Sequence, residues 1–116
     1  MLFASATPIV AGATDRYRSI ADELSPHHAE YERLNRLYEV SRHSYWISHP
    51  RTGSDIGVSV YDISSDGLGA MRSRVWDPSS EHDRWWLGFV HDVNGFDMTA
   101  ESPHVAAPEQ VWSWEQ

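Results

Sequence analysis

The sequence predicts an α+β domain with one antiparallel sheet and the element order β-α-β-β-α-β. The strongest observation is a hairpin pattern, in which residues 42–49 and 55–63 alternate between apolar and polar around a turn at 51–54. A helix-periodic stretch lies on either side of this hairpin, and a short apolar run lies near each end of the chain. This order of elements places a pocket between the sheet and the helices.

The composition fits a single domain over residues 1–116. Apolar residues make up 41% and charged residues 22%, which is ordinary for a protein with one hydrophobic core. The net charge of −8 argues against nucleic acid as a partner, because phosphates require a basic face. No apolar run approaches the roughly 18 residues of a membrane span, and no basic flank of a signal peptide precedes the first strand. The chain has no cysteine, so we expect a cytoplasmic protein without disulfides or membrane binding.

Six tryptophans are more than one small core usually takes. We expect the surplus at a subunit interface or around a flat ligand. Trp112 and Trp114 share one face of a predicted strand over residues 111–114, which indicates a dimer seam.

The first strand is predicted over residues 2–7, and Pro8 ends its ladder. Thr14 is the expected N-cap of the helical stretch that follows. Its apolar residues recur on one face, namely Tyr17, Ile20, Ala21 and Leu24, continued by Tyr31, Leu34 and Tyr38. Ser25-Pro26 has the form of a second helix start, so we expect a break at this point.

If residues 51–54 form a four-residue turn, cross-strand partners in the hairpin sum to 105. The predicted pairs are His43 with Asp62, Tyr45 with Val60, Ile47 with Val58, and His49 with Ile56. These eight residues share one side of the hairpin, which we expect to pack against the helices. A slip of one residue would exchange the faces.

After the hairpin, residues 64–67 are predicted as a turn and 68–74 as a short helical segment. Asp77-Pro78 is expected to start the last helix, which ends near Asn94 because Gly95 can adopt the left-handed conformation. A loop over residues 102–108 leads to the predicted fourth strand.

The sharpest candidate site combines His43 with Asp62. Directly opposed residues lie about 5 Å apart at Cβ, so Asp62 could fix the tautomer of His43. His43 would then act as a general acid or base, and Tyr45 would donate a hydrogen bond to a developing oxyanion. The alternative is a satisfied polar pair at the rim of the sheet with no catalytic role.

His82 is the second candidate, because it lies in the apolar stripe of the last helix, one turn before Trp86. It should point into the layer between helix and sheet; the alternative is a half-solvated residue of the first turn. An apolar pocket wall is expected from Trp86 and Phe89, with Ile47, Val58 and Val60 on the sheet.

Seven histidines raise the question of a metal, but their spacing brings no ligand set together locally. His43 and His49 share a strand face yet lie about 20 Å apart. His91 is expected to be exposed, and His27 and His28 to lie on a solvated face. A metal site assembled from separate elements is the alternative, but nothing in the sequence indicates one. Dinucleotide fingerprints and phosphate-binding glycine loops are also absent, so we expect no metal and no organic cofactor.

This layout resembles the dimeric α+β barrel superfamily, whose ferredoxin-like plaits close two sheets against each other. The resemblance covers essentially the whole chain and rests on the helical stretch over residues 14–40, the hairpin around Gly53 and the helix end Asn94-Gly95-Phe96-Asp97. The segment His82-Asp83-Arg84-Trp85-Trp86 is also similar to the last helix of small uncharacterised bacterial members. The resemblance implies a homodimer with a ligand cavity between each sheet and its helices.

Members of that superfamily include cofactor-independent monooxygenases, polyketide cyclases, isomerases, haem enzymes and binding proteins. No residue set here selects one branch, and His43, His82 and His104 are not ranked as haem ligands. We expect a small-molecule enzyme that moves a proton on an aromatic or polyketide-like substrate, as a cyclase, isomerase or monooxygenase does. The alternative is a non-catalytic homodimer that binds a ligand or supports a partner enzyme.

Overall fold

A computed structural model describes residues 1–99 and confirms the α+β class. Its open antiparallel sheet has the strand order β1-β3-β2. The strands are β1 (Leu2–Pro8), β2 (Val40–Ser48) and β3 (Ile56–Ile63). The helices are α1 (Thr14–Arg18), α2 (Ile20–Leu24), the 3-10 helix η1 (Ser25–His27), α3 (His28–Leu37), α4 (Ser65–Arg72) and α5 (Glu81–Asn94). The predicted fourth strand at 111–114 lies outside the described residues.

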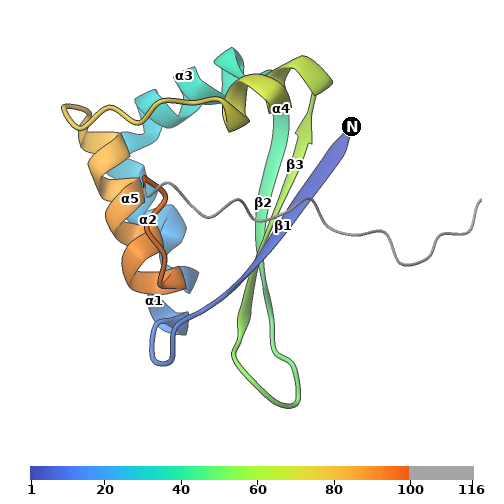
Figure 1. The fold of residues 1–116 in the computed structure, drawn as a ribbon, viewed down its shortest axis with the longest axis vertical. Helices are drawn as coiled ribbons and strands as arrows, with labels where there is room; N and C mark the ends of the chain where they lie inside the picture. The colour runs from blue at the N-terminus through green and yellow to red at the C-terminus, as the bar shows by residue number, and fades with distance from the viewer. Residues whose placement is uncertain (100–116) are drawn as a thin grey trace, which may run out of the picture.

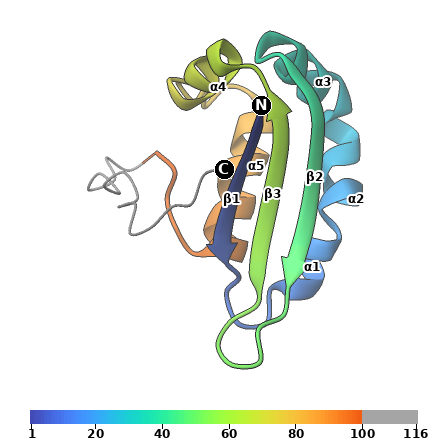
Figure 2. The same cartoon turned by 90° about the vertical axis from the view of Figure 1, so that its right-hand side faces the viewer.

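The helices cover one face of the sheet. Figure 1 shows α1, α2 and α5 opposite the strands, with α3 and α4 across one end. Figure 2 shows the other face of the sheet toward the viewer, with no described helix over it. Within residues 1–99, no helix combines the length and the apolar character needed to cross a membrane.

The first helical layer is broken at Ser19 as well as at the expected point near Ser25, where η1 begins. Thr14 is not the N-cap, because Ala13 holds that position and makes no side-chain cap hydrogen bond. The Thr14 hydroxyl instead donates to Oδ2 of Asp55 at 2.7 Å. This bond fastens the start of α1 to the hairpin loop.

The hairpin register differs by one residue from the prediction. His43 pairs with Tyr61, Tyr45 with Ser59, and Ile47 with Gly57, so the partners sum to 104. The strands end at Ser48 and begin again at Ile56, which makes residues 49–55 the loop. His49 lies in this loop with Nδ1 2.9 Å from Oδ1 of Asp55, and it does not face Ile56.

Close packing of α1 on β3 explains the exchanged faces. A Cβ atom on Gly57 would lie 2.7 Å from Cε2 of Tyr17, so only glycine fits at this point without a shift. Gly57 therefore faces the helices, and alternate residues Ser59 and Tyr61 face them too. Val58 and Val60, which were predicted to face the helices, lie on the uncovered side.

Two clusters of buried side chains hold the helices against the sheet. One contains Ile9, Tyr17, Ile20, Phe89 and Val93. The other contains Leu34, Tyr38, Ile63 and Leu68. The helical stripe predicted from the sequence supplies residues to both clusters, which shows that its period identified the buried face correctly.

The two later helices begin at serine N-caps, Ser64 and Ser80, and not at the predicted starting points. Ser64 accepts a hydrogen bond from the Gly67 N–H at 2.9 Å, so the predicted turn at 64–67 is the first turn of α4. α5 begins at Glu81 instead of Asp77-Pro78, because the Ser80 hydroxyl caps it. Gly95 ends α5 with φ of 76°, as predicted.

Candidate functional site

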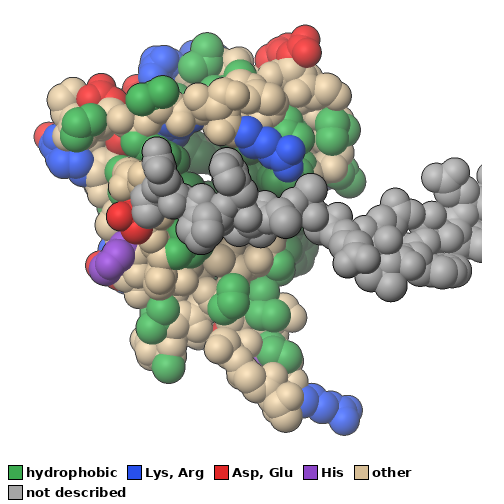
Figure 3. Space-filling view, viewed as in Figure 1, with side chains coloured by type: hydrophobic (Ala, Val, Ile, Leu, Met, Phe, Trp, Pro, Cys, Tyr) green, Lys and Arg blue, Asp and Glu red, His purple; other side chains and the backbone are tan. Residues whose placement is uncertain are grey.

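A cavity of 440 Å³ lies between the helix-facing side of the sheet and the helices. Side chains from both buried clusters line it, and Trp76, Trp85 and Trp86 add aromatic surface. Figure 3 shows the molecule hollowed beneath α4. Pockets for small molecules typically measure roughly 300–1,000 Å³ and are mostly apolar with a few polar groups, so this cavity has a suitable size and lining.

His43 lies on the sheet wall of the cavity with both ring nitrogens hydrogen-bonded. Nδ1 is 2.7 Å from the Tyr31 hydroxyl, and Nε2 is 2.7 Å from the Ser59 hydroxyl. The ring stacks on Tyr61 with 3.8 Å between centroids. Burial lowers the pKa of His43 from 6.5 to about 4, so the imidazole is neutral at neutral pH.

The predicted pair of His43 and Asp62 is not formed. Asp62 is the strand partner of Arg42, and its carboxylate lies 3.5 Å from the amino group of Met1. The change of register by one residue turns Asp62 to the opposite face and brings Tyr61 against His43. The prediction failed because it placed the hairpin turn at 51–54, whereas the loop spans residues 49–55.

Phenol groups surround His43. Tyr45 lies beside it, as predicted, with 4.3 Å between ring centroids. Burial raises the pKa of Tyr45 well above its ordinary value, and a hydrogen bond to Tyr61 acts in the same direction. Burial also raises the pKa of Tyr61, whereas hydrogen bonds from Ser59 and Tyr45 partly oppose that change. The Tyr61 side chain thus lies on the cavity wall, stacked on His43.

Both ring nitrogens of His43 face a hydroxyl group, and a neutral imidazole carries a single ring proton. One of the two hydroxyls therefore donates to His43, and the other accepts from it.

A histidine oriented by a carboxylate is present at His82. This side chain is buried, and its Nδ1 lies 3.0 Å from Oδ1 of Asp83. Asp83 is also buried; it forms an ion pair with Arg74 and accepts a hydrogen bond from the Asp77 N–H at 2.9 Å. Burial alone would raise the pKa of Asp83, but these hydrogen bonds and the charge of Arg74 hold it below its ordinary value. The carboxylate therefore keeps the proton on Nδ1 and leaves the Nε2 lone pair open.

His82 lines the cavity, and so does Trp86 one turn further along α5. The His82 ring packs edge-to-face with the His27 ring, with 6.1 Å between centroids. The His27 ring in turn stacks on Trp85, with 5.1 Å between centroids. His27 is thus part of the packed layer, contrary to the expected solvated position. Among residues 1–99, no group hydrogen-bonds to Nε2 of His82.

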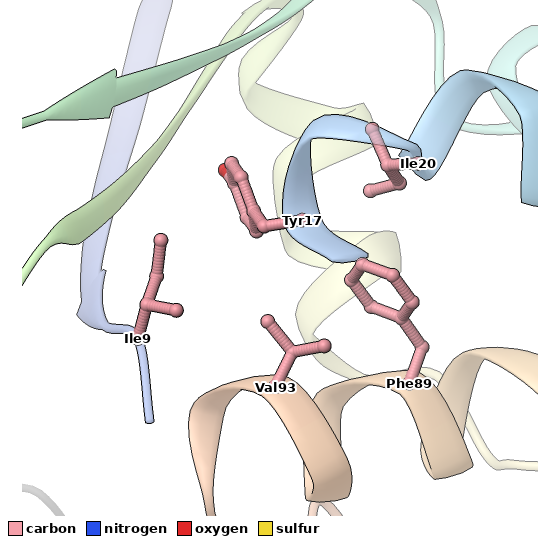
Figure 4. Close-up of a cluster of buried hydrophobic side chains, with 5 residues drawn as sticks. All are labelled: Ile9, Tyr17, Ile20, Phe89 and Val93. Atoms are coloured by element: carbon pink, nitrogen blue, oxygen red, sulfur yellow. The ribbon is translucent and has the colours of Figure 1, made fainter. Parts of the chain in front are cut away.

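The remaining predicted wall residues lie elsewhere. Phe89 is 1% exposed and belongs to the core cluster drawn in Figure 4. Ile47 packs against that same cluster. Val58 and Val60 are on the uncovered sheet face, so none of these four side chains lines the cavity. Their places on its wall are taken by tyrosine and tryptophan side chains.

Sequence reasoning missed five polar residues of the site: Tyr31, Ser59, Tyr61, Arg74 and Asp83. The two strand residues would have followed from the correct register. Asp83 had a signal, because it directly follows His82 in the sequence. Arg74 had none, since it reaches Asp83 from the segment between α4 and α5.

Comparison with known proteins identifies no relative: the chain matches no protein-family model, no curated protein and no solved structure. The resemblance to the dimeric α+β barrel superfamily therefore stays a prediction. In the described part of the chain, no group of three or more histidine, cysteine or acidic side chains is placed to hold a metal ion.

Proposed function

We propose that the protein is a cytoplasmic small-molecule enzyme that moves a proton on an aromatic or polyketide-like substrate, as cofactor-independent cyclases, isomerases and monooxygenases do. The observation that carries the proposal is the arrangement of His82. Its Nδ1 is held by Asp83, and it lines a largely aromatic cavity of 440 Å³. Histidine is the most frequent general acid or base in enzymes, and a fixed tautomer directs the lone pair of Nε2 at the ligand.

The chain has the groups for one complete proton transfer. Nε2 of His82 takes a proton from a carbon next to a substrate carbonyl, and the C–H electron pair forms an enolate. Asp83 stabilises the resulting imidazolium at Nδ1, and the Tyr61 hydroxyl donates a hydrogen bond to the enolate oxygen. Return of the proton from Nε2 to another carbon of the substrate completes an isomerisation and restores neutral His82.

His43 has a different task in this proposal from the one expected of it. Both of its nitrogens are engaged, so it does not accept a proton from the substrate. It positions the Tyr61 side chain through ring stacking. His43 is therefore a positioning residue, and Tyr61 takes the role predicted for Tyr45.

Hydrogen–deuterium exchange tests the proposal without a known substrate. 2-Tetralone carries exchangeable protons beside its carbonyl, and ¹H NMR in D₂O follows their loss. We expect the protein to accelerate this exchange and His82→Gln to reduce the acceleration by roughly 10²-fold or more, the contribution of a general base. His91→Gln changes an exposed histidine on the same helix and should keep the full rate. Equal rates for His82→Gln and the unaltered protein would contradict the role of His82.

We also propose that two copies associate through the uncovered face of the sheet, as a dimeric barrel requires. This face carries exposed apolar side chains: Leu2 pairs with Asp62 and Trp46 with Val58 in the strand register, and the two are 71% and 62% exposed. Burial of such side chains stabilises an interface. Trp46→Glu should convert a dimer to a monomer in light scattering, whereas Val75→Glu, at an 88% exposed site outside the sheet, should not. A monomeric unaltered protein would contradict the dimer.

A non-catalytic homodimer that binds or scaffolds a ligand is the second candidate. It is favoured by the hydrogen bonding of His43, because a satisfied polar network stiffens a cavity without performing chemistry. This candidate predicts that aromatic molecules bind and quench tryptophan fluorescence, while the exchange of 2-tetralone stays at its rate in buffer.

A further inference from the structure

The cavity wall has the opposite charge to the protein as a whole. The chain has 17 acidic and 9 basic residues, which gives a net charge of −8. Among residues 1–99, however, the charged side chains that line the cavity are Arg72 and Arg74, and no aspartate or glutamate lines it. An acid-free lining in so acidic a protein favours an anionic ligand over a neutral or cationic one.

Arg74 is already compensated. It forms an ion pair with Asp83, and its guanidinium lies 4.3 Å from the centroid of the Trp76 ring. Asp83 does not line the cavity, so this pair presents the arginine to the cavity and keeps the carboxylate behind it. Arg74 therefore serves mainly to hold Asp83, and through it His82.

Arg72 is the uncompensated charge. It is the last residue of α4, and its guanidinium lies 5.0 Å above the Phe3 ring. No carboxylate in the described part of the chain forms an ion pair with it. Its side chain is exposed while lining the cavity, which places it at the mouth. Figure 3 shows basic side chains beside the hollow beneath α4.

The position of Arg72 suits recognition of a carboxylate. A guanidinium held over an aromatic ring keeps its planar set of N–H donors in one orientation, which matches the two oxygens of a carboxylate. Charge-assisted hydrogen bonds of this kind are stronger than neutral ones. The apolar interior beyond Arg72 is lined by Trp85 and Trp86, which offer flat surfaces to aromatic rings.

We propose that the cavity binds an aromatic carboxylate, with the rings inside against the tryptophans and the carboxylate on Arg72 at the mouth. This inference deepens the proposed function, since it names the ligand class of the same cavity. It also gives the ligand a direction, because the anionic end stays at the mouth and the ring system extends toward His82.

Isothermal titration calorimetry with 2-naphthoate and its uncharged counterpart 2-naphthamide tests the inference. We expect 2-naphthoate to bind about tenfold more tightly, because only the anion uses the charge of Arg72. Arg72→Gln should abolish this preference and leave the affinity for 2-naphthamide unchanged. Arg51→Gln removes the same charge from the exposed hairpin loop, so it controls for net charge and should keep the preference. Rising salt should reduce the preference for 2-naphthoate, because Arg72 is exposed and salt screens its attraction to the ligand carboxylate.

Equal affinity for the two ligands, failure of both to bind, or a preference that survives Arg72→Gln would overturn the inference. Circular dichroism of each variant shows whether it folds, and Arg72→Lys, which retains the charge, should keep part of the preference. The binding measurement requires no turnover. A protein that prefers 2-naphthoate through Arg72 but does not exchange 2-tetralone would retain this inference and refute the enzymatic proposal.

Discussion

Mild acid should destabilise the protein through His43. Burial keeps this side chain neutral in the fold, with its pKa lowered from 6.5 to about 4. The unfolded chain binds a proton at His43 once the pH falls below about 6.5, whereas the folded chain does so only near 4. The stability that depends on neutral His43 is therefore complete above pH 6.5 and is lost progressively as the pH falls toward 4.

The size of this effect follows from the difference between the two pKa values. At about 1.4 kcal/mol for each pKa unit, lowering the pKa of His43 from 6.5 to about 4 corresponds to about 3 kcal/mol. About 2 kcal/mol of this should be lost between about pH 7.5 and about pH 5, where the carboxylates with lowered pKa values remain ionised. Small domains have a total stability of roughly 5–15 kcal/mol, so the loss is measurable.

Urea unfolding at the two pH values measures the effect, with His43→Phe as the comparison. The variant keeps a ring against Tyr61 but has no titratable group at position 43. Subtracting its loss of unfolding free energy from that of the unaltered protein therefore removes the contribution of the carboxylates, which is the same in both. We expect the free energy of unfolding to fall by about 2 kcal/mol more in the unaltered protein than in the variant. Equal losses in the two proteins would show that His43 is not held neutral by burial.

Other substitutions test the packing and the second histidine. Gly57→Ala should destabilise by about 1–3 kcal/mol in thermal unfolding, because its Cβ would lie 2.7 Å from Tyr17. Gly69→Ala, with no atom within 4 Å of its Cβ, should stabilise α4 by up to about 1 kcal/mol, and equal effects of the two alanines would contradict the packing of α1 on β3. Phe89→Ala should cost about 3–5 kcal/mol in urea unfolding, whereas a cost below about 1 kcal/mol would place Phe89 outside the core. Asp83→Asn leaves Arg74, whose side chain is 14% exposed, without its ion-pair partner and should cost about 3 kcal/mol. In ¹⁵N NMR of this variant the His82 ring should no longer hold its proton on Nδ1 alone; an unchanged spectrum would show that Asp83 does not set the tautomer.

The sequence was sufficient to predict the helical core and the class of the fold. Ile20, Leu34 and Tyr38 are buried as their spacing predicted, because helical periodicity is a local property of the chain. Gly95 ends α5 for an equally local reason, since its positive φ is readily adopted by glycine. The location of a cavity between sheet and helices followed from the same order of elements.

The hairpin register could not be predicted from the sequence, because it depends on a contact between residues far apart in the chain. Aliphatic Val58 and Val60 resemble core residues, yet the packing of Tyr17 on Gly57 turns the other side of β3 to the helices. The register error of one residue also led to the wrong prediction that Asp62 pairs with His43. The structure pairs the second candidate, His82, with the carboxylate of the next residue, Asp83. Residue types suggested a carboxylate and a histidine, but only the tertiary fold shows which ones meet.

The most direct test of the proposed site is a crystal structure of the protein with 2-naphthoate. We expect density for the ring system in the cavity against Trp86, the carboxylate on Arg72, and Nε2 of His82 open toward the ligand. A cavity filled by the protein's own side chains, or an Nε2 that is hydrogen-bonded to another protein group, would contradict it.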